Sequence, residues 1–210
     1  MTHCVIVFLL LAAGRAAADP SEAALAVPLR VHLLRSRAAG AAGTVLTTAD
    51  VERVVEKAGR IWAQAGLSLT VDRVVEERAT GPLAESTGTL GSESLSSLVP
   101  SASFDPRAFN VYFIRRMQAN GILVPHQGLP AIFVKDTAQL RQVPAGADEP
   151  IPRVLSHELG HALGLAHQEE VQNLMASGTS GTSLNALEKQ AARKNASTVP
   201  WIRRVAAGQR

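Results

Sequence analysis

The chain has 210 residues, a hydrophobic content of 46% and a formal net charge of +3 at neutral pH. This length and apolar content fit one globular domain with a full hydrophobic core. The small excess of bases contains no Lys/Arg block, which argues against a nucleic-acid partner.

The N-terminal segment has the features of a secretory signal peptide. Val5–Ala13 is an uninterrupted apolar run, and the alanines at 16–18 offer a small-residue cleavage site before Asp19. The run is too short to span a bilayer. We therefore expect a signal peptide at 1–18, secretion to the extracellular space or periplasm, and no stable membrane insertion. Cys4, the only cysteine, would be removed with it, so no disulfide would support the mature chain.

A strand, a helix and a second strand are expected next. Val27–Arg35 alternates in part between apolar and polar residues, which is typical of a strand. Thr47 or Thr48 can cap the helix that follows, which runs through Asp50 to about Ala65 and stops at Gly66. Its apolar residues recur at spacings of three and four and should face the core. Leu67–Val75 alternates again and is the second predicted strand.

The middle of the chain contains a long irregular segment and two further strands. Thr80–Pro106 is rich in Ser, Gly, Thr and Pro, and we expect a surface excursion with one helical turn around Glu93–Leu98. Phe109–Ile114 is a β-prone apolar run and should be a central strand. Gly128–Asp136 should contain the strand nearest the site, at Ala131–Val134.

Two helices are predicted in the last third. Ala138–Glu149 is expected to be a loop, and Pro150 and Pro152 flank the start of a helix. A final helix should run from Ser183 to about Ala196. We expect its inward residues to be Leu184, Leu187 and Ala191.

The most informative stretch is His157–His167, which reads H-E-L-G-H-A-L-G-L-A-H. Histidines four residues apart share one face of a helix and can bind one metal ion. Gly164 lets the chain leave the helix through a positive-φ turn, after which His167 can return as a third ligand. Three histidines plus a water form the usual catalytic zinc arrangement. With 6 His and 16 Gly in 210 residues, the two further positions match by chance about once in 500.

This pattern resembles the extended zinc-binding consensus of the metzincin clan of metalloproteases. Met175, eight residues after His167, resembles the methionine of the turn that follows the consensus in that clan. The short spacer is similar to that of small secreted bacterial matrixin-like proteases. The resemblance implies an α+β fold, with a twisted mixed sheet, a long helix, a zinc-site helix and a small helical C-terminal part. Residues 19–210 would form one catalytic domain, with an upper part at about 27–166 and a lower part at about 167–210.

The resemblance also implies a zinc endopeptidase. One Zn²⁺ would be bound by His157, His161 and His167, and Glu158 would act as general base on the zinc-activated water. The substrate would be a polypeptide that pairs with the edge of the strand at Ala131–Val134. Met175 would pack beneath the zinc. Calcium is possible but no Asp/Gly-rich loop indicates it, and we expect a monomer.

Other interpretations are compatible with the sequence. The same ligands would serve a zinc hydrolase of another amide or small peptide, or a zinc-retaining binding domain without catalysis. The Tyr-Pro pair that often follows the methionine in matrixins is replaced by Ala176-Ser177. His126 is either a substrate or second-layer contact or plain loop surface. His32 is expected to be an internal strand residue without a metal role.

Overall fold

The computed structural model describes residues 23–36 and 40–205, so the predicted signal peptide lies outside the described residues. Six strands form one sheet: β1 (Ala24–Arg35), β2 (Leu67–Arg78), β3 (Phe109–Ile114), β4 (Gly121–His126), β5 (Leu129–Lys135) and β6 (Arg203–Val205). The helices are α1 (Thr48–Trp62), α2 (Ser92–Leu95), α3 (Pro150–Ala162) and α4 (Ala186–Thr198). None of the helices in these residues is long and apolar enough to cross a membrane.

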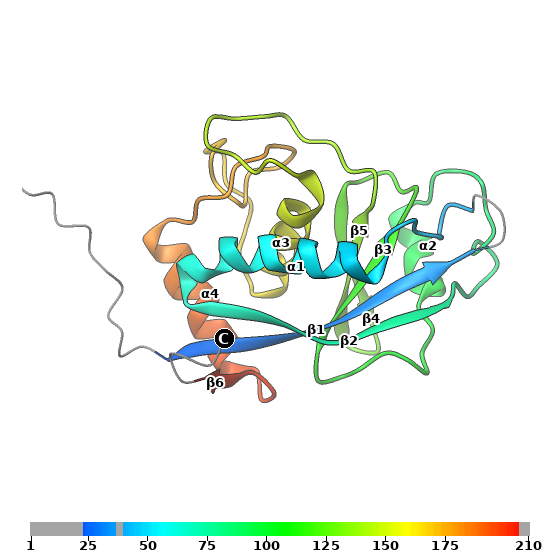
Figure 1. The fold of residues 1–210 in the computed structure, drawn as a ribbon, viewed down its shortest axis with the longest axis horizontal. Helices are drawn as coiled ribbons and strands as arrows, with labels where there is room; N and C mark the ends of the chain where they lie inside the picture. The colour runs from blue at the N-terminus through cyan, green and yellow to red at the C-terminus, as the bar shows by residue number, and fades with distance from the viewer. Residues whose placement is uncertain (1–22, 37–39, 206–210) are drawn as a thin grey trace, which may run out of the picture.

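The sheet is mixed and its order is β2-β1-β3-β5-β4, with β6 paired to the start of β1. The first four strands in this order are parallel to one another, and β4 is antiparallel to β5. The mixed, twisted sheet with helices is the α+β fold class that the sequence predicted (Figure 1). Because β4 lies outermost, one of its sides is unpaired within the sheet of the described residues.

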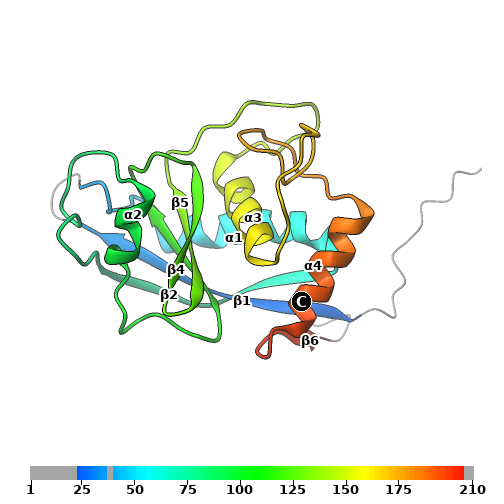
Figure 2. The same ribbon diagram turned by 180° about the vertical axis from the view of Figure 1, so that it is seen from behind.

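Helices and an irregular segment cover opposite faces of the sheet. α1 and α3 contact each other and pack on one face (Figures 1 and 2). The other face is covered by the segment between β2 and β3, which contains α2. Every residue of β3 is buried because both faces are covered. Its Val111 and Phe113 belong to the helical side of the core, whereas Tyr112 and Ile114 belong to the other side.

Local sequence signals explain the bounds of α1. Thr47 caps its N-terminus, where the Thr47 side chain accepts a hydrogen bond from the Asp50 backbone and the Asp50 side chain accepts one from the Thr47 backbone. The helix ends in a short 3₁₀ turn at Ala63–Ala65, and Gly66 then has a φ of 66°. Gly66 is thus the stop that the sequence predicted, since positive φ is strained for residues with a Cβ. The predicted stripe is buried: Val51, Val54, Val55, Ala58, Ile61 and Trp62.

The prediction about the strand that borders the site was wrong. β5 contains Ala131–Val134, but it pairs with β3 on one side and β4 on the other. Its backbone hydrogen-bonding groups are therefore used within the sheet. The exposed edge at the cavity belongs to β4, a strand that the sequence did not predict and that contains Pro125. A proline is tolerated there because an edge strand has one side without partners.

Three further expectations are corrected by packing. The segment between β2 and β3 is a cover for the sheet, and its Leu90, Leu95, Leu98, Val99 and Phe104 are buried; its predicted helical turn is present.

In α4, Leu187 is 77% exposed, while Ala192 and Ala196 face inward. The helix starts three residues later than predicted because Asn185 caps it with Glu188. β6, which the sequence did not predict, adds a short strand after α4.

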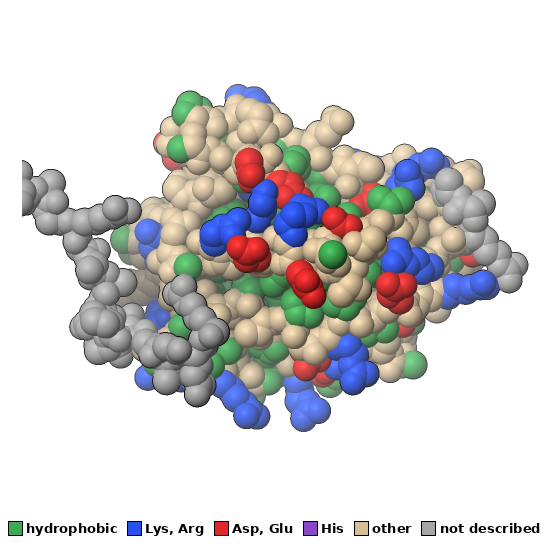
Figure 3. All heavy atoms as spheres, viewed as in Figure 1, with side chains coloured by type: hydrophobic (Ala, Val, Ile, Leu, Met, Phe, Trp, Pro, Cys, Tyr) green, Lys and Arg blue, Asp and Glu red, His purple; other side chains and the backbone are tan. Residues whose placement is uncertain are grey.

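Ion pairs join α1 to the chain just before α3. Lys57 contacts Asp148 at 2.8 Å and Glu149 at 3.1 Å, and Arg53 also contacts Glu149. Acidic and basic side chains accordingly alternate over α1 on the face shown in Figure 3. These pairs connect the start of α3 to the long helix, although exposed ion pairs contribute little stability individually.

Candidate active site

The predicted ligand helix is α3, and it is almost entirely buried. Pro150 stands in its first turn, where a missing backbone N–H costs nothing. The helix packs against α1 on one side and against β4 and β5 on another. This packing fixes the direction of His157 and His161, which share one helix face.

The chain reverses after α3 at Gly164, as the sequence predicted. Gly164 has a φ of 82°, and a Cβ there would lie 2.7 Å from Nδ2 of Asn195. Asn195 of α4 donates a hydrogen bond to the carbonyl of Leu163 at 2.8 Å, so α4 holds the end of α3. The reversal brings His167 back beside the helix.

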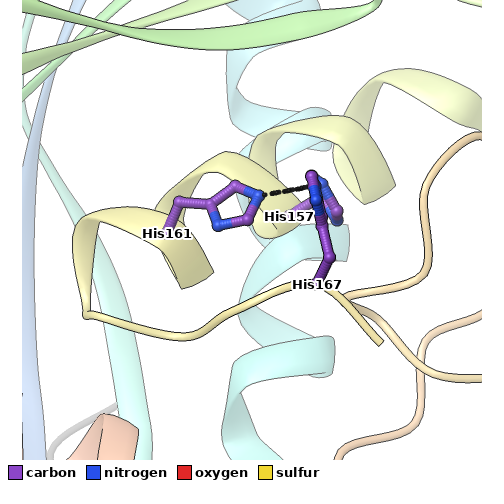
Figure 4. A group of neighbouring side chains, drawn as sticks. All are labelled: His157, His161 and His167. Carbon is purple, nitrogen blue, oxygen red and sulfur yellow. Dashed lines mark hydrogen bonds between the residues drawn. The ribbon is translucent and has the colours of Figure 1, made fainter. Parts of the chain in front are cut away.

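The three predicted ligands meet at one point (Figure 4). Nε2 of His161 lies 3.2 Å from Nε2 of His157 and 3.1 Å from Nε2 of His167. Nitrogens bound tetrahedrally to zinc at 2.0–2.1 Å are about 3.3 Å apart, which matches these separations. Within residues 23–36 and 40–205, this is the one group of three or more His, Cys, Asp or Glu placed to hold a metal ion.

The hydrogen bonds of the imidazoles fit a metal between them. Nδ1 of His157 donates to the carbonyl of Leu174 at 2.8 Å, and Nδ1 of His161 donates to the carbonyl of Leu165 at 2.8 Å. With the proton on Nδ1, each Nε2 has only a lone pair, so two such nitrogens cannot bond to each other. A cation at their common point satisfies both, as in metal-ligating histidines generally.

Burial keeps the imidazole of His157 neutral. His157 is 7% exposed, and burial lowers its pKa to about 4. Partial burial also lowers the pKa of His161. Neutral imidazoles are the form that binds metals. The donor set therefore suits zinc, which prefers nitrogen ligands in such numbers.

Met175 lies in the core under this helix. Its side chain is fully buried, and a Cβ added to Gly160 would lie 2.5 Å from its Sδ. Gly160 stands between the two helical histidines, so the thioether fits into the space that the missing side chain leaves. The adjacent carbonyl of Leu174 accepts the hydrogen bond from His157. The turn at Met175 thus supports the imidazole through both packing and a hydrogen bond.

Glu158 is buried next to the first ligand and lines the same cavity as the three histidines. Burial raises the pKa of its carboxyl to about 7, and the nearby Arg153 acts in the opposite direction. The carboxylate approaches β4 at Gly121, where a Cβ would lie 2.5 Å from Oε1 of Glu158. Only a residue without a side chain leaves room for Glu158 at that place.

The cavity at the histidines has a volume of about 380 Å³. β4 contributes Gly121, Ile122 and Leu123 to its wall. Leu140 and Ser177 come from the loops before and after α3. Arg153, one helical turn before His157, also lines the cavity and was not predicted from the sequence. Its signal was present, because residues four apart on a helix lie on the same face.

The two other histidines of the described residues lie away from the cavity lining. His126 is in β4, and its ring packs against Phe104 with centroids 4.8 Å apart. His32 is buried in β1, where its Nδ1 lies 2.7 Å from Oε1 of Glu77 and its Nε2 lies 3.1 Å from Oδ1 of Asn110. It is the internal strand residue that the sequence predicted.

No protein-family profile matches the sequence, and no curated protein matches it. Solved structures match in fold. Metalloproteinase-II from Bacteroides fragilis has a TM-score of 0.50 at 13% identity, over 84% of this chain and 55% of that one. Archaemetzincin from Methanopyrus kandleri has a TM-score of 0.49 at 14% identity, over 80% of this chain and 94% of that one.

Mature mirolysin from Tannerella forsythia, in complex with a cleaved peptide, has a TM-score of 0.49 at 15% identity, over 76% of this chain and 70% of that one. The fold is similar to that of metalloproteinase-II. At these identities the likeness is one of fold. In this chain the three histidines meet beside the cavity that borders β4.

Proposed function

We propose that the protein is a secreted zinc endopeptidase of the metzincin type, similar to the small bacterial matrixin-like enzymes. The observation that carries this proposal is the convergence of three Nε2 atoms beside the buried carboxylate of Glu158 in one cavity. The catalytic domain would span residues 19–210 after removal of the signal peptide at 1–18. Its ligands would be His157, His161 and His167, and its base would be Glu158.

His157, His161 and His167 would hold a zinc ion, which would supply Lewis-acid chemistry for the bound water and the substrate carbonyl. Glu158 would transfer the protons of the hydrolysis. Its carboxylate would accept a proton from the attacking water and donate it afterwards to the leaving amine. This carboxylate lies against the backbone of β4 at Gly121, where a Cβ would be 2.5 Å from its Oε1.

An extended polypeptide fits the edge of the cavity. β4 has its unpaired side at the edge of the sheet and contributes three consecutive residues, Gly121–Leu123, to the lining. A substrate strand can add to such an edge by backbone hydrogen bonds, which give affinity without dependence on sequence. One of the proteins similar in fold is a metalloproteinase, which also supports a peptide substrate.

Two variants of the mature, zinc-loaded protein test the assignment. Glu158→Gln should retain one zinc per chain and the native melting temperature while losing most cleavage of a peptide library. His167→Ala should lose most zinc affinity because it removes one of three ligands. Zinc content is measured by elemental analysis, and cleavage by mass spectrometry with and without chelator.

The outcomes separate the alternatives. Wild-type protein that binds zinc but cleaves no peptide would support a binding domain. Cleavage restricted to free dipeptides would support a hydrolase of small peptides. Wild-type turnover in Glu158→Gln would remove Glu158 from the base role.

A further inference from the structure

Arg153 is a buried cation in the wall of the active-site cavity, and the proposed hydrolysis gives it no role. It is 2% exposed and stands one helical turn before His157. Its Nε donates to the carbonyl of Gly181 at 3.1 Å, and its Nη2 donates to the carbonyls of Leu174, at 2.7 Å, and Ala176. The other terminal nitrogen, Nη1, takes part in none of these bonds.

No carboxylate of the described part of the chain forms an ion pair with this guanidinium, and the acidic group that acts on it electrostatically is Glu158 in the same cavity. None of the ion pairs found there includes Arg153. Burial lowers the pKa of Arg153 to about 10, so the side chain stays charged at neutral pH. The three carbonyls satisfy N–H groups but contribute no net negative charge. Buried charges in proteins are normally paired, and the proposed function assigns Glu158 to proton transfer, so the guanidinium can pair with a further carboxylate from a ligand.

The cavity provides the path for such a counter-charge. Arg153, Glu158 and the three histidines line the same 380 Å³ space, so a group that reaches Arg153 is attached next to the bond being cleaved. Leu123, Leu140 and Val154 form apolar walls that suit the methylene groups of a side chain. A guanidinium and a carboxylate form strong, geometrically specific hydrogen bonds. Arg153 is desolvated in the folded protein already, which favours pairing with an incoming carboxylate.

We propose that the cavity binds the side-chain carboxylate of an Asp or Glu that flanks the cleaved peptide bond, with Arg153 as its partner. This inference rests on the proposed endopeptidase function and specifies its substrate class. Arg153 is then a specificity-determining residue. Peptides with an acidic residue at that position are preferred over those with its neutral isostere.

Matched peptides test the preference. Blocked peptides, acetylated at the N-terminus and amidated at the C-terminus, carry either Glu or Gln at each position flanking the cleaved bond. The measured quantity is the ratio of kcat/KM for Glu over Gln, because this ratio is independent of the amount of active enzyme. For the wild type we expect a ratio of about 10–100 at one flanking position, as for a hydrogen-bonded charged pair.

Three variants locate the cation responsible. Arg153→Met removes the charge but keeps a long apolar stem, and its ratio should fall to about 1. Arg153→Lys keeps the charge and should retain a reduced preference. The matched control is Arg141→Met, which removes an exposed charge from the nearby loop outside the cavity lining. It should leave the ratio within about twofold, since exposed charges are screened.

Binding provides a readout that does not need turnover. Zinc-loaded Glu158→Gln should bind the Glu peptide more tightly than the Gln peptide in fluorescence anisotropy. A wild-type ratio near 1, an unchanged ratio in Arg153→Met, or equal binding of the two peptides would overturn the proposal. A preference found only with a free C-terminal carboxylate would also overturn it, because it would assign Arg153 to the chain end. Absence of any cleavage would instead count against the endopeptidase function, while the binding comparison would still decide the role of Arg153.

Discussion

Replacing Met175 by alanine tests whether this residue supports the histidines by packing alone. The side chain is fully buried and its Sδ fills the space over Gly160. Truncating a buried methionine to alanine costs about 2–5 kcal/mol of unfolding free energy, since it loses burial and leaves a cavity. For a domain of this size, that corresponds to a decrease of about 4–20 °C in melting temperature.

The contact between Gly160 and Met175 also predicts how substitutions at these two positions combine. Gly160→Ala alone places a methyl group where Sδ of Met175 lies, and overpacking of this kind costs about 1–3 kcal/mol. In the double variant Gly160→Ala/Met175→Ala, the new methyl group occupies part of the space that the thioether leaves. The double variant should therefore be more stable than the sum of the two single changes predicts, because contacting residues are not additive.

Thermal unfolding of all four proteins, with and without zinc, measures this coupling. Met175→Leu is the matched control, since a side chain of similar volume should cost less than about 1.5 kcal/mol and leave zinc content and turnover near normal. Additive losses in the double variant would refute the packing contact. Loss of zinc by Met175→Leu with an intact fold would mean that the sulfur itself acts on the metal.

Two further predictions concern β4 and the sheet core. Gly121→Ala should lower kcat while zinc content stays at the wild-type level, because the added methyl group displaces the Glu158 carboxylate and no ligand; wild-type kcat would contradict this placement. Burial lowers the pKa of His32 below its ordinary 6.5, although Glu77 and Asn110 oppose the shift. The unfolded chain then binds this proton more readily, so the unfolding free energy should decrease as pH falls below about 6.5. In urea titrations His32→Gln should lose this part of the pH dependence, and an unchanged difference between pH 8 and pH 5.5 would argue against it.

Local sequence patterns were sufficient for most of the elements and for the ligand set. The spacing of His157, His161 and His167 around Gly164 predicted their convergence, because helix periodicity and a positive-φ turn are local properties. The start of α1 at Thr47 and its end at Gly66 are also determined by residues within one turn. The roles of these residues in catalysis remain predictions for the assays above.

Contacts between distant segments decided the features that the local sequence patterns did not predict. β4 is a strand because it pairs with β5, and this pairing makes β4 the edge at the cavity in place of Ala131–Val134. Leu187 is exposed because Asn185 caps α4 and thereby sets which face of the helix meets the core. Arg153 lines the cavity with its hydrogen bonds directed to carbonyls more than twenty residues away. The local sequence was enough to predict that the three histidines converge, since that geometry is contained in eleven consecutive residues. The tertiary structure alone decided which strand edge and which cation border these histidines, because these depend on contacts between segments distant in the chain.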